Sequence, residues 1–241
     1  MPLMKNLVIA AKNLGELAMP EFCPRCFWIK LHAGKLPFQI FPGIFSSIDA
    51  YTKNIVHSYF DNNGRFPSWL DSLGELEGYQ EPLHYSKFRV RDSASGVTLQ
   101  GTPDAIYKKK DGSYIIADYK TAKYTGNQDK LMPIYEVQLN AYGMIGERSG
   151  LVKPVSDLAL IYMEPVTGKD AITDSSNHRD DGFAMGFSAN IHRVELKPSI
   201  IPPLLDKARE LYALESPPDG RLGCKECSNL TNLINVASME S

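Results

Sequence analysis

The stretch from Leu99 to Lys120 constrains the fold most strongly, because it reads as two β-strands joined by a tight turn. Asp104 lies in the first half, Asp118 lies in the second, and Lys120 follows two residues later. Side chains alternate in direction along a strand, so Asp118 and Lys120 point to the same face. The sequence therefore predicts an acid and a cation on one surface of a sheet.

The length of the turn decides whether Asp104 joins that surface. A two-residue turn at 111–112 would pair Ala105 with Asp118 and send Asp104 to the opposite face, because a one-residue slip reverses every side chain. A three-residue loop at 110–112, ending in a glycine in the left-handed conformation, pairs Asp104 with Asp118 directly. Their Cβ atoms then lie about 5 Å apart. Two such carboxylates repel unless they hold a cation or share a proton.

The four cysteines form two Cys-x-x-Cys pairs, Cys23 with Cys26 and Cys224 with Cys227, about 200 residues apart. Four thiolates are the ligand set of a tetrahedral zinc site or of an iron–sulfur cluster. Two independent redox pairs or inert cysteines are the alternatives. We favour one shared metal site that ties the two ends of the chain together, because no cysteine is left over.

The composition is that of an ordinary globular domain, with 241 residues, 43% hydrophobic and 22% charged. We expect one domain over residues 1–241, in which the cysteine-bearing segments 1–40 and 216–241 flank a core of 41–215. No apolar run approaches the roughly 18 to 20 residues that span a bilayer. The apolar run at 7–11 is short and has no clear cleavage site, so we predict no signal peptide, no membrane partner and a cytoplasmic protein.

The net charge of −2 and a pI near 6.2 argue against nucleic-acid binding by bulk electrostatics alone. Local basic clusters remain available for phosphate contacts: Lys87, Arg89 and Arg91, then Lys108 to Lys110, then Lys120, Lys123 and Lys130. We interpret the run at 108–110 as a solvated turn.

Hydrophobic periodicity predicts the remaining elements. We expect helices at 46–60, 131–147 and 203–214, strands at 85–91, 97–107, 114–120, 155–163 and 183–196, a loop or short helical connection at 62–82, and a polar link at 121–128. The segment between 163 and 183 is expected to be a mobile excursion.

Two of these helices carry polar faces that bear on the acidic hairpin. Asp49, Lys53 and His57 recur at four-residue steps and share one face of the helix at 46–60. The plain interpretation is a solvated face with an Asp49–Lys53 ion pair; the sharper one is that Asp49 or His57 reaches the acidic hairpin. On the helix at 131–147, Gln138 and Tyr142 also share a face.

This ordered set of residues suits metal-assisted phosphodiester hydrolysis. Asp104 and Asp118 would hold one or two Mg²⁺ or Mn²⁺ ions, which prefer carboxylate and water oxygens. Lys120 would position the attacking water or stabilise charge on the phosphate.

The chain resembles the PD-(D/E)XK nuclease superfamily, in particular the RecB-like exonuclease branch that includes the CRISPR-associated exonucleases. The motifs that carry the resemblance are Gly101-Thr-Pro-Asp104, Asp118-Tyr-Lys120 and Gln138-Leu-Asn-Ala-Tyr142, in the order and approximate spacing of that branch. The resemblance covers nearly the whole chain. It implies an α/β fold with a restriction-endonuclease-like core, in which helices flank a mixed central sheet.

The resemblance also implies residue roles: metal ligands at Asp104 and Asp118, a third ligand at the Tyr119 carbonyl, a catalytic Lys120, and DNA or site contacts by Gln138 and Tyr142. Two positions depart from the pattern. The branch places a histidine ligand a few residues after a glycine, and here Asp49 fills that place after Gly43, so we prefer Asp49 over His57. The branch has one early and three late cysteines where this chain has two and two, so zinc rivals a [4Fe–4S] cluster.

The leading hypothesis is a metal-dependent DNA nuclease, an exonuclease on single-stranded or end-bearing DNA, acting in repair, recombination or defence with protein partners. The first alternative is a non-catalytic nucleic-acid-binding or assembly module that keeps the fold and the four-cysteine site. The second is a zinc-stabilised structural protein in which the Asp-x-Lys motif is accidental.

Overall fold

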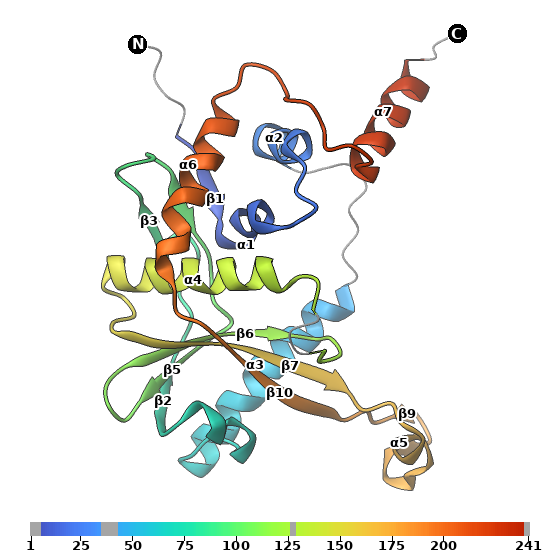
Figure 1. The fold of residues 1–241 in the computed structure, drawn as a ribbon. Coiled ribbons are helices and arrows are strands. Elements are labelled where there is room, and N and C mark those ends of the chain that lie inside the picture. Colours follow the sequence, from blue (N-terminus) through green and yellow to red (C-terminus); the bar gives the residue numbers. More distant parts are fainter. Residues whose placement is uncertain (1–5, 35–42, 126–128, 239–241) are drawn as a thin grey trace.

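A five-stranded mixed sheet forms the centre of the protein (Figure 1). The structure is a computed structural model that describes residues 6–34, 43–125 and 129–238. The strand order is β10-β7-β6-β5-β2, and every neighbouring pair is antiparallel except β6 with β7. The strands are β2 (Leu76–Gln80), β5 (Ala105–Lys109), β6 (Tyr114–Lys120), β7 (Val155–Pro165) and β10 (Phe187–Val194).

The hairpin of β5 and β6 adopts the three-residue register. Ala105 pairs with Ala117 and Lys108 pairs with Tyr114, and the Lys109 N–H donates to the Ser113 carbonyl at 2.9 Å. The loop at 110–112 ends at Gly112, whose φ of 83° lies in the left-handed region. The position before β5 therefore lies opposite Asp118, which decides between the two turns in favour of the three-residue loop.

The two faces of the sheet bury separate hydrophobic clusters because side chains alternate along β6. Ile115, Ala117 and Tyr119 pack on the side of helix α3 (Gly43–Asn63), with Val56 of that helix and with the 3₁₀ helix η2 (Ser68–Leu73). Ile116 points to the other side, toward helix α4 (Met132–Ser149). The same alternation directs Asp118 toward α4.

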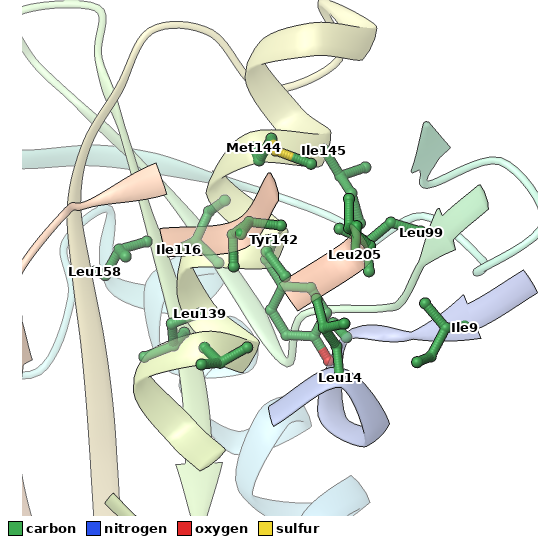
Figure 2. Packing of buried hydrophobic residues seen from close by; sticks show 14 of the residues in the cluster. Ile9, Leu14, Leu99, Ile116, Leu139, Tyr142, Met144, Ile145, Leu158 and Leu205 are labelled. Carbon is green, nitrogen blue, oxygen red and sulfur yellow. The ribbon is translucent and has the colours of Figure 1, made fainter. Parts of the chain in front are cut away.

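A second sheet packs beyond α4, in the order β1-β4-β3, and its strands are β1 (Val8–Ala10), β3 (Arg89–Arg91) and β4 (Thr98–Gln100). Helices α1 (Ala11–Gly15) and α6 (Ile201–Tyr212) contribute to the same core (Figure 2). Helix α1 approaches α4 closely, because a Cβ on Gly15 would lie 2.7 Å from the Ile134 carbonyl oxygen.

The two cysteine pairs begin helices near opposite ends of the chain. Helix α2 (Pro24–Ala33) follows Cys23, and helix α7 (Lys225–Ala237), which the sequence left unassigned, follows Cys224. The Trp28 indole N–H donates to the Leu214 carbonyl at 3.1 Å, so α2 also contacts the segment after α6. Both terminal segments lie on the α6 side of the molecule (Figure 1).

Several predicted elements need correction. The single strand at 97–107 is two strands, β4 and β5, in different sheets, with Gly101 to Asp104 crossing between them. The segment 62–82 contains the edge strand β2, and the strand at 85–91 is reduced to β3.

The excursion after β7 has secondary structure of its own: helix α5 (Lys169–Thr173), the 3₁₀ helix η4 (Ser175–Asn177), and the paired strands β8 (His178–Arg179) and β9 (Gly182–Phe183). The strand predicted from 183 therefore begins at Phe187. A last 3₁₀ turn, η5 (Pro198–Ile200), leads into α6, and η1 (Glu16–Ala18) follows α1. The polar link at 121–128 lies in part outside the described residues.

The basic run at 108–110 lies at the hairpin turn, as its interpretation as a solvated turn predicts. Lys108 and Lys110 pair with Glu77 and Glu75 near β2, and Lys109 pairs with Asp157 at 3.1 Å. These lysines are neutralised locally, and they lie at the far end of the hairpin from Asp104 and Asp118. Among the helices that the structure describes, none is long and apolar enough to cross a bilayer.

Candidate active site

Asp104 sits at the beginning of β5, where the chain enters the central sheet. One carboxylate oxygen, Oδ2, accepts a hydrogen bond from the Tyr119 backbone N–H at 2.9 Å. The other, Oδ1, lies 2.8 Å from Nζ of Lys53 on helix α3. The side chain is only 18% exposed, so β6 and α3 hold this carboxylate in a fixed place.

Asp118 is buried on β6, facing α4. Its Oδ1 accepts a hydrogen bond from Gln138 Nε2 at 3.0 Å, and its Oδ2 contacts the ammonium group of Lys120. The Lys120 Nζ also lies 4.3 Å from the centre of the Tyr135 ring, which places the cation over an aromatic face. The predicted acid and lysine therefore do share one surface.

Helix α3 brings a third carboxylate to this end of the sheet. Asp49 lines the same cavity as Asp104 and Asp118, and its Oδ2 lies 2.7 Å from Lys53 Nζ. His57, two turns later, stacks on Tyr79 with ring centres 3.8 Å apart. Asp49 rather than His57 therefore reaches the site.

Gln138 and Tyr142 lie one turn apart on α4 and form part of the wall of the cavity. Gln138 Nε2 donates to the Tyr142 hydroxyl at 3.0 Å as well as to Asp118, and both side chains are 5% exposed. The Tyr142 ring packs against the backbone of Gly101, where an added Cβ would lie 2.3 Å from Cε1 of the ring. These residues contact the site; their predicted contact with DNA stays a prediction.

These side chains surround an open cavity of about 460 Å³. Its lining comes from α1, from the beginning of α3, from the segments that begin β5 and end β6, and from α4: Lys12, Phe45, Ser46, Asp49, Thr102, Asp104, Asp118, Tyr119, Lys120, Thr121, Ala122, Tyr135, Gln138 and Tyr142. Every residue that the sequence assigned to catalysis, to the Mg²⁺ or Mn²⁺ site or to substrate binding is in this set, and only the four cysteines lie elsewhere.

The lysines of the cavity balance the charge of its carboxylates. Burial, followed by the charge of Asp118, raises the pKa of Asp104 from 3.8 to about 6, although Lys53 and the Tyr119 N–H oppose the shift. Burial alone would lower the pKa of Lys53, but Asp104 and Asp49 outweigh it and raise that pKa. Three carboxylates and three ammonium groups, those of Lys12, Lys53 and Lys120, meet here, so the site carries no net charge when all are ionised.

The donor set fits a hard divalent metal ion. Gln138 Oε1 is a buried oxygen with no hydrogen-bond partner among the described residues, whereas the equally buried Asp118 Oδ2 is in contact with the Lys120 ammonium. Buried polar atoms are usually satisfied, so the unpaired Gln138 oxygen calls for a partner such as a water molecule or a metal ion. Carboxylate and amide oxygens are the ligand types that Mg²⁺ and Mn²⁺ prefer.

Sequence reasoning missed two residues of this site. Lys53 was assigned only to an ion pair with Asp49, although it also bridges to Asp104. The ring of Tyr135 lies against the Lys120 ammonium, but nothing in the sequence marked Tyr135 as a site residue beyond its place in the first turns of α4. The four-residue step from Asp49 to Lys53 was the available signal for the first.

The four cysteines form a second cluster, between the beginnings of α2 and α7. All four Sγ atoms lie within 4.8 Å of one another, and the closest pairs are 3.3 to 3.6 Å apart. A tetrahedral zinc with Zn–S bonds of about 2.3 Å separates its sulfur atoms by about 3.8 Å. The four thiolates can thus share one metal centre, and both zinc and a [4Fe–4S] cluster use such a ligand set.

Backbone groups support the cysteine cluster. The Arg221 N–H donates to Cys23 Sγ at 3.3 Å, and a Cβ on Gly220 would lie 2.9 Å from Cys227 Sγ. Burial opposes ionisation of Cys23, but the N–H groups of Cys26 and Arg221 outweigh it and lower the pKa of that thiol to about 7. Burial and the neighbouring thiols instead raise the pKa of Cys26 and of Cys227, so only Cys23 is shifted toward the metal-binding thiolate form.

A sequence profile described as "PD-(D/E)XK nuclease superfamily" matches residues 59–229, well over half of the chain. The chain belongs to this superfamily. The match includes Asp104, Asp118 and Lys120, whereas Asp49 and Lys53 lie before it. The RecB-like and CRISPR-associated branch stays a prediction.

Two solved structures are similar to this chain. The crystal structure of SSO0001 is 16% identical with a TM-score of 0.41, over 89% of this chain and 80% of that one. An alkaline exonuclease (LHK-Exo) from Laribacter hongkongensis is 9% identical with a TM-score of 0.45, over 95% of this chain and 93% of that one. No curated protein matches by sequence.

Proposed function

We propose that the protein is a metal-dependent DNA nuclease, an exonuclease that hydrolyses phosphodiester bonds in single-stranded or end-bearing DNA. The observation that carries this proposal is the meeting of Asp104, Asp118 and Lys120 in one cavity of a PD-(D/E)XK chain. A cytoplasmic role in DNA repair, recombination or defence, alongside protein partners, completes the proposal.

Asp104, Asp118, Asp49 and the Tyr119 carbonyl would hold Mg²⁺ or Mn²⁺. When bound, such an ion lowers the pKa of a coordinated water and stabilises negative charge on the phosphate. The cysteine cluster has a structural role in this proposal, with zinc or a [4Fe–4S] cluster joining the terminal segments.

The chain's own groups would orient the reactants. Lys120 extends from the end of β6 beside Asp118, where its ammonium can hold the attacking water or face the scissile phosphate. The Tyr135 ring restricts where that ammonium can point. Gln138 fixes the orientation of Asp118, and the Tyr142 hydroxyl fixes Gln138.

The test uses purified protein with Mg²⁺ or Mn²⁺ and end-labelled single-stranded DNA, duplex DNA and RNA. We expect divalent-dependent release of labelled products from DNA. Lys120→Ala and Asp104→Ala should each reduce the rate at least about 10²-fold, the size of effect seen when one group that stabilises transition-state charge is removed.

Lys123→Ala is the matched control, because Lys123 belongs to the same basic cluster and has no ion pair with a described residue. Its rate should stay within about threefold of the wild type. Activity that survives both Lys120→Ala and Asp104→Ala would rule out this assignment. A non-catalytic module would lack one of the acids or the lysine, whereas all three are present and converge here.

A further inference from the structure

Lys53 joins two of the three carboxylates of the site. Its Nζ lies 2.7 Å from Asp49 Oδ2 and 2.8 Å from Asp104 Oδ1, so one ammonium joins helix α3 to the start of β5. The side chain is 28% exposed, which leaves part of the ammonium desolvated between two carboxylates. Charge-assisted hydrogen bonds of this kind are short and strong.

The position of Lys53 matters because carboxylates that bridge two elements are also the places where paired metal ions bind. Two-metal hydrolases set their ions about 3.5–4 Å apart on shared carboxylates. Here Asp104 offers one side to Lys53 and Asp118 offers its Oδ2 to Lys120. Each carboxylate retains further lone pairs. Asp104 and Asp118 therefore keep lone pairs for one shared ion, whereas Lys53 already contacts the facing oxygens of Asp104 and Asp49.

The charges lead to the same conclusion. Lys12, Lys53 and Lys120 balance the three carboxylates, so a single divalent ion already makes the site positive. A second divalent ion would have to bind beside the Lys53 ammonium and against a net positive charge. Without Lys53 the site would carry one negative charge and an open pair of carboxylates, Asp49 and Asp104.

We propose that Lys53 is a built-in cation that takes the place of a second metal ion, so that the site binds one divalent ion per chain. This inference rests on the proposed function, because it concerns the metal held by the same carboxylates. Lys53 is a positioning residue in this role: it holds Asp49 and Asp104 together and sets the metal stoichiometry.

The experiment counts bound Mn²⁺ by calorimetric titration and by electron paramagnetic resonance, using protein whose cysteine cluster keeps the metal with which it is isolated. Asp104→Asn serves as the reference for binding elsewhere on the chain. We expect one Mn²⁺ per chain in the wild type, with the spectrum of an isolated ion. We expect two in Lys53→Met, which keeps the length of the side chain but removes its charge, and a spin-coupled spectrum.

Two further variants separate this role from a general effect of charge. Lys53→Arg keeps the cation and should bind one ion. Lys12→Met removes a lysine that also lines the cavity but has no ion pair with any described residue, and it should bind one ion as well.

Two Mn²⁺ ions in the wild type would overturn the inference, whatever the variants do and whether or not they fold. The same number of ions in Lys53→Met as in the wild type would also overturn it. If the wild type binds no Mn²⁺ beyond the Asp104→Asn reference, then the proposed metal-dependent function fails, and the inference fails with it.

Discussion

The carboxylate site and the cysteine cluster are assembled in opposite ways. Asp104 and Asp118 belong to one hairpin, and the register of neighbouring strands brings them together. The cysteines that meet are about 200 residues apart, as in the 3.5 Å contact of Cys23 with Cys227. The first site is a local consequence of the sheet, whereas the second closes a loop of nearly the whole chain.

The two sites also differ in what balances their charges. The carboxylates of the first receive Lys53, Lys120, the Gln138 amide and the Tyr119 N–H. The thiols of the second mainly face one another, and the nearest charged group to Cys224 Sγ is a carboxylate, that of Glu226 at 3.4 Å. The carboxylate site can therefore keep its shape without a metal ion, while the cysteine cluster depends on one.

The largest effect is expected from breaking the cysteine cluster. Cys227→Ser removes one of four thiolates and should abolish stable metal binding there. Structural zinc sites provide about 10–16 kcal/mol of apparent binding free energy, so the segments around α2 and α7 should open. Elemental analysis would show the loss of the metal. Hydrogen exchange would show the opening of these segments as lost protection of the α2 and α7 amides.

Ser228→Ala, an exposed neighbour on the same helix, should keep both the metal and the protection. The Mn²⁺ affinity of the carboxylate site in Cys227→Ser should stay within about threefold of the wild type. A larger loss would show that the two sites are coupled and would contradict the comparison.

A smaller, pH-dependent effect is expected at Asp104. In the unfolded chain this carboxyl ionises near its ordinary value of 3.8, but in the folded protein without divalent ions its pKa is about 6. The folded state then binds more protons between these values, so this group's contribution to stability falls as the pH rises through that window and stays low above it. Two pKa units correspond to about 3 kcal/mol.

Asp104→Asn should therefore be more stable than the wild type at pH 7.5 by up to about 3 kcal/mol, with the difference shrinking toward zero near pH 4. Urea unfolding without divalent ions, at both pH values, measures it. The exposed Asp111 is the control of opposite sign, because the Ser113 hydroxyl and N–H lower its pKa. Asp111→Asn should lose a little stability at pH 7.5. A variant–wild-type difference at Asp104 that is independent of pH would contradict the prediction.

The local site was predictable from sequence because its determinants are local. A glycine at position 112 and the alternation of β6 set the register, and they place Asp104, Asp118 and Lys120 together. The break between β4 and β5 was missed, because the sequence does not show that these two strands pair with different partners in different sheets. Strand β2 was missed since Gly78 argued for a loop, whereas an edge strand with a register shift tolerates a glycine.

The contacts of Lys53, on helix α3, were likewise only partly predictable from the sequence. Its pairing with Asp49 follows from a four-residue step, and this part was visible in the sequence. Its contact with Asp104 depends on the first half of α3 reaching the end of the sheet where β5 begins. That placement is set by the packing of Val56 and η2 on the sheet, which no local pattern encodes.

The smallest effect is expected from the close approach of Gly101 to Tyr142. A Cβ at position 101 would lie 2.3 Å from the ring, and the ring is buried in the core shared by α4 and the second sheet (Figure 2). Overpacking of this kind costs about 1–3 kcal/mol. Gly101→Ala should lower the free energy of unfolding by about that amount. Because Tyr142 holds Gln138, and Gln138 holds Asp118, it should also weaken Mn²⁺ binding.

Gly78→Ala is the matched control, since an added Cβ there meets no described atom within 4 Å. It should change neither stability nor Mn²⁺ affinity appreciably. The metal content of the cysteine cluster should be unchanged in both variants, because α4 transmits the strain to the carboxylates and not to the terminal helices. Loss of the cysteine-bound metal in Gly101→Ala would mean that the two sites share one packing unit, and the contrast between a local and a long-range site would have to be abandoned.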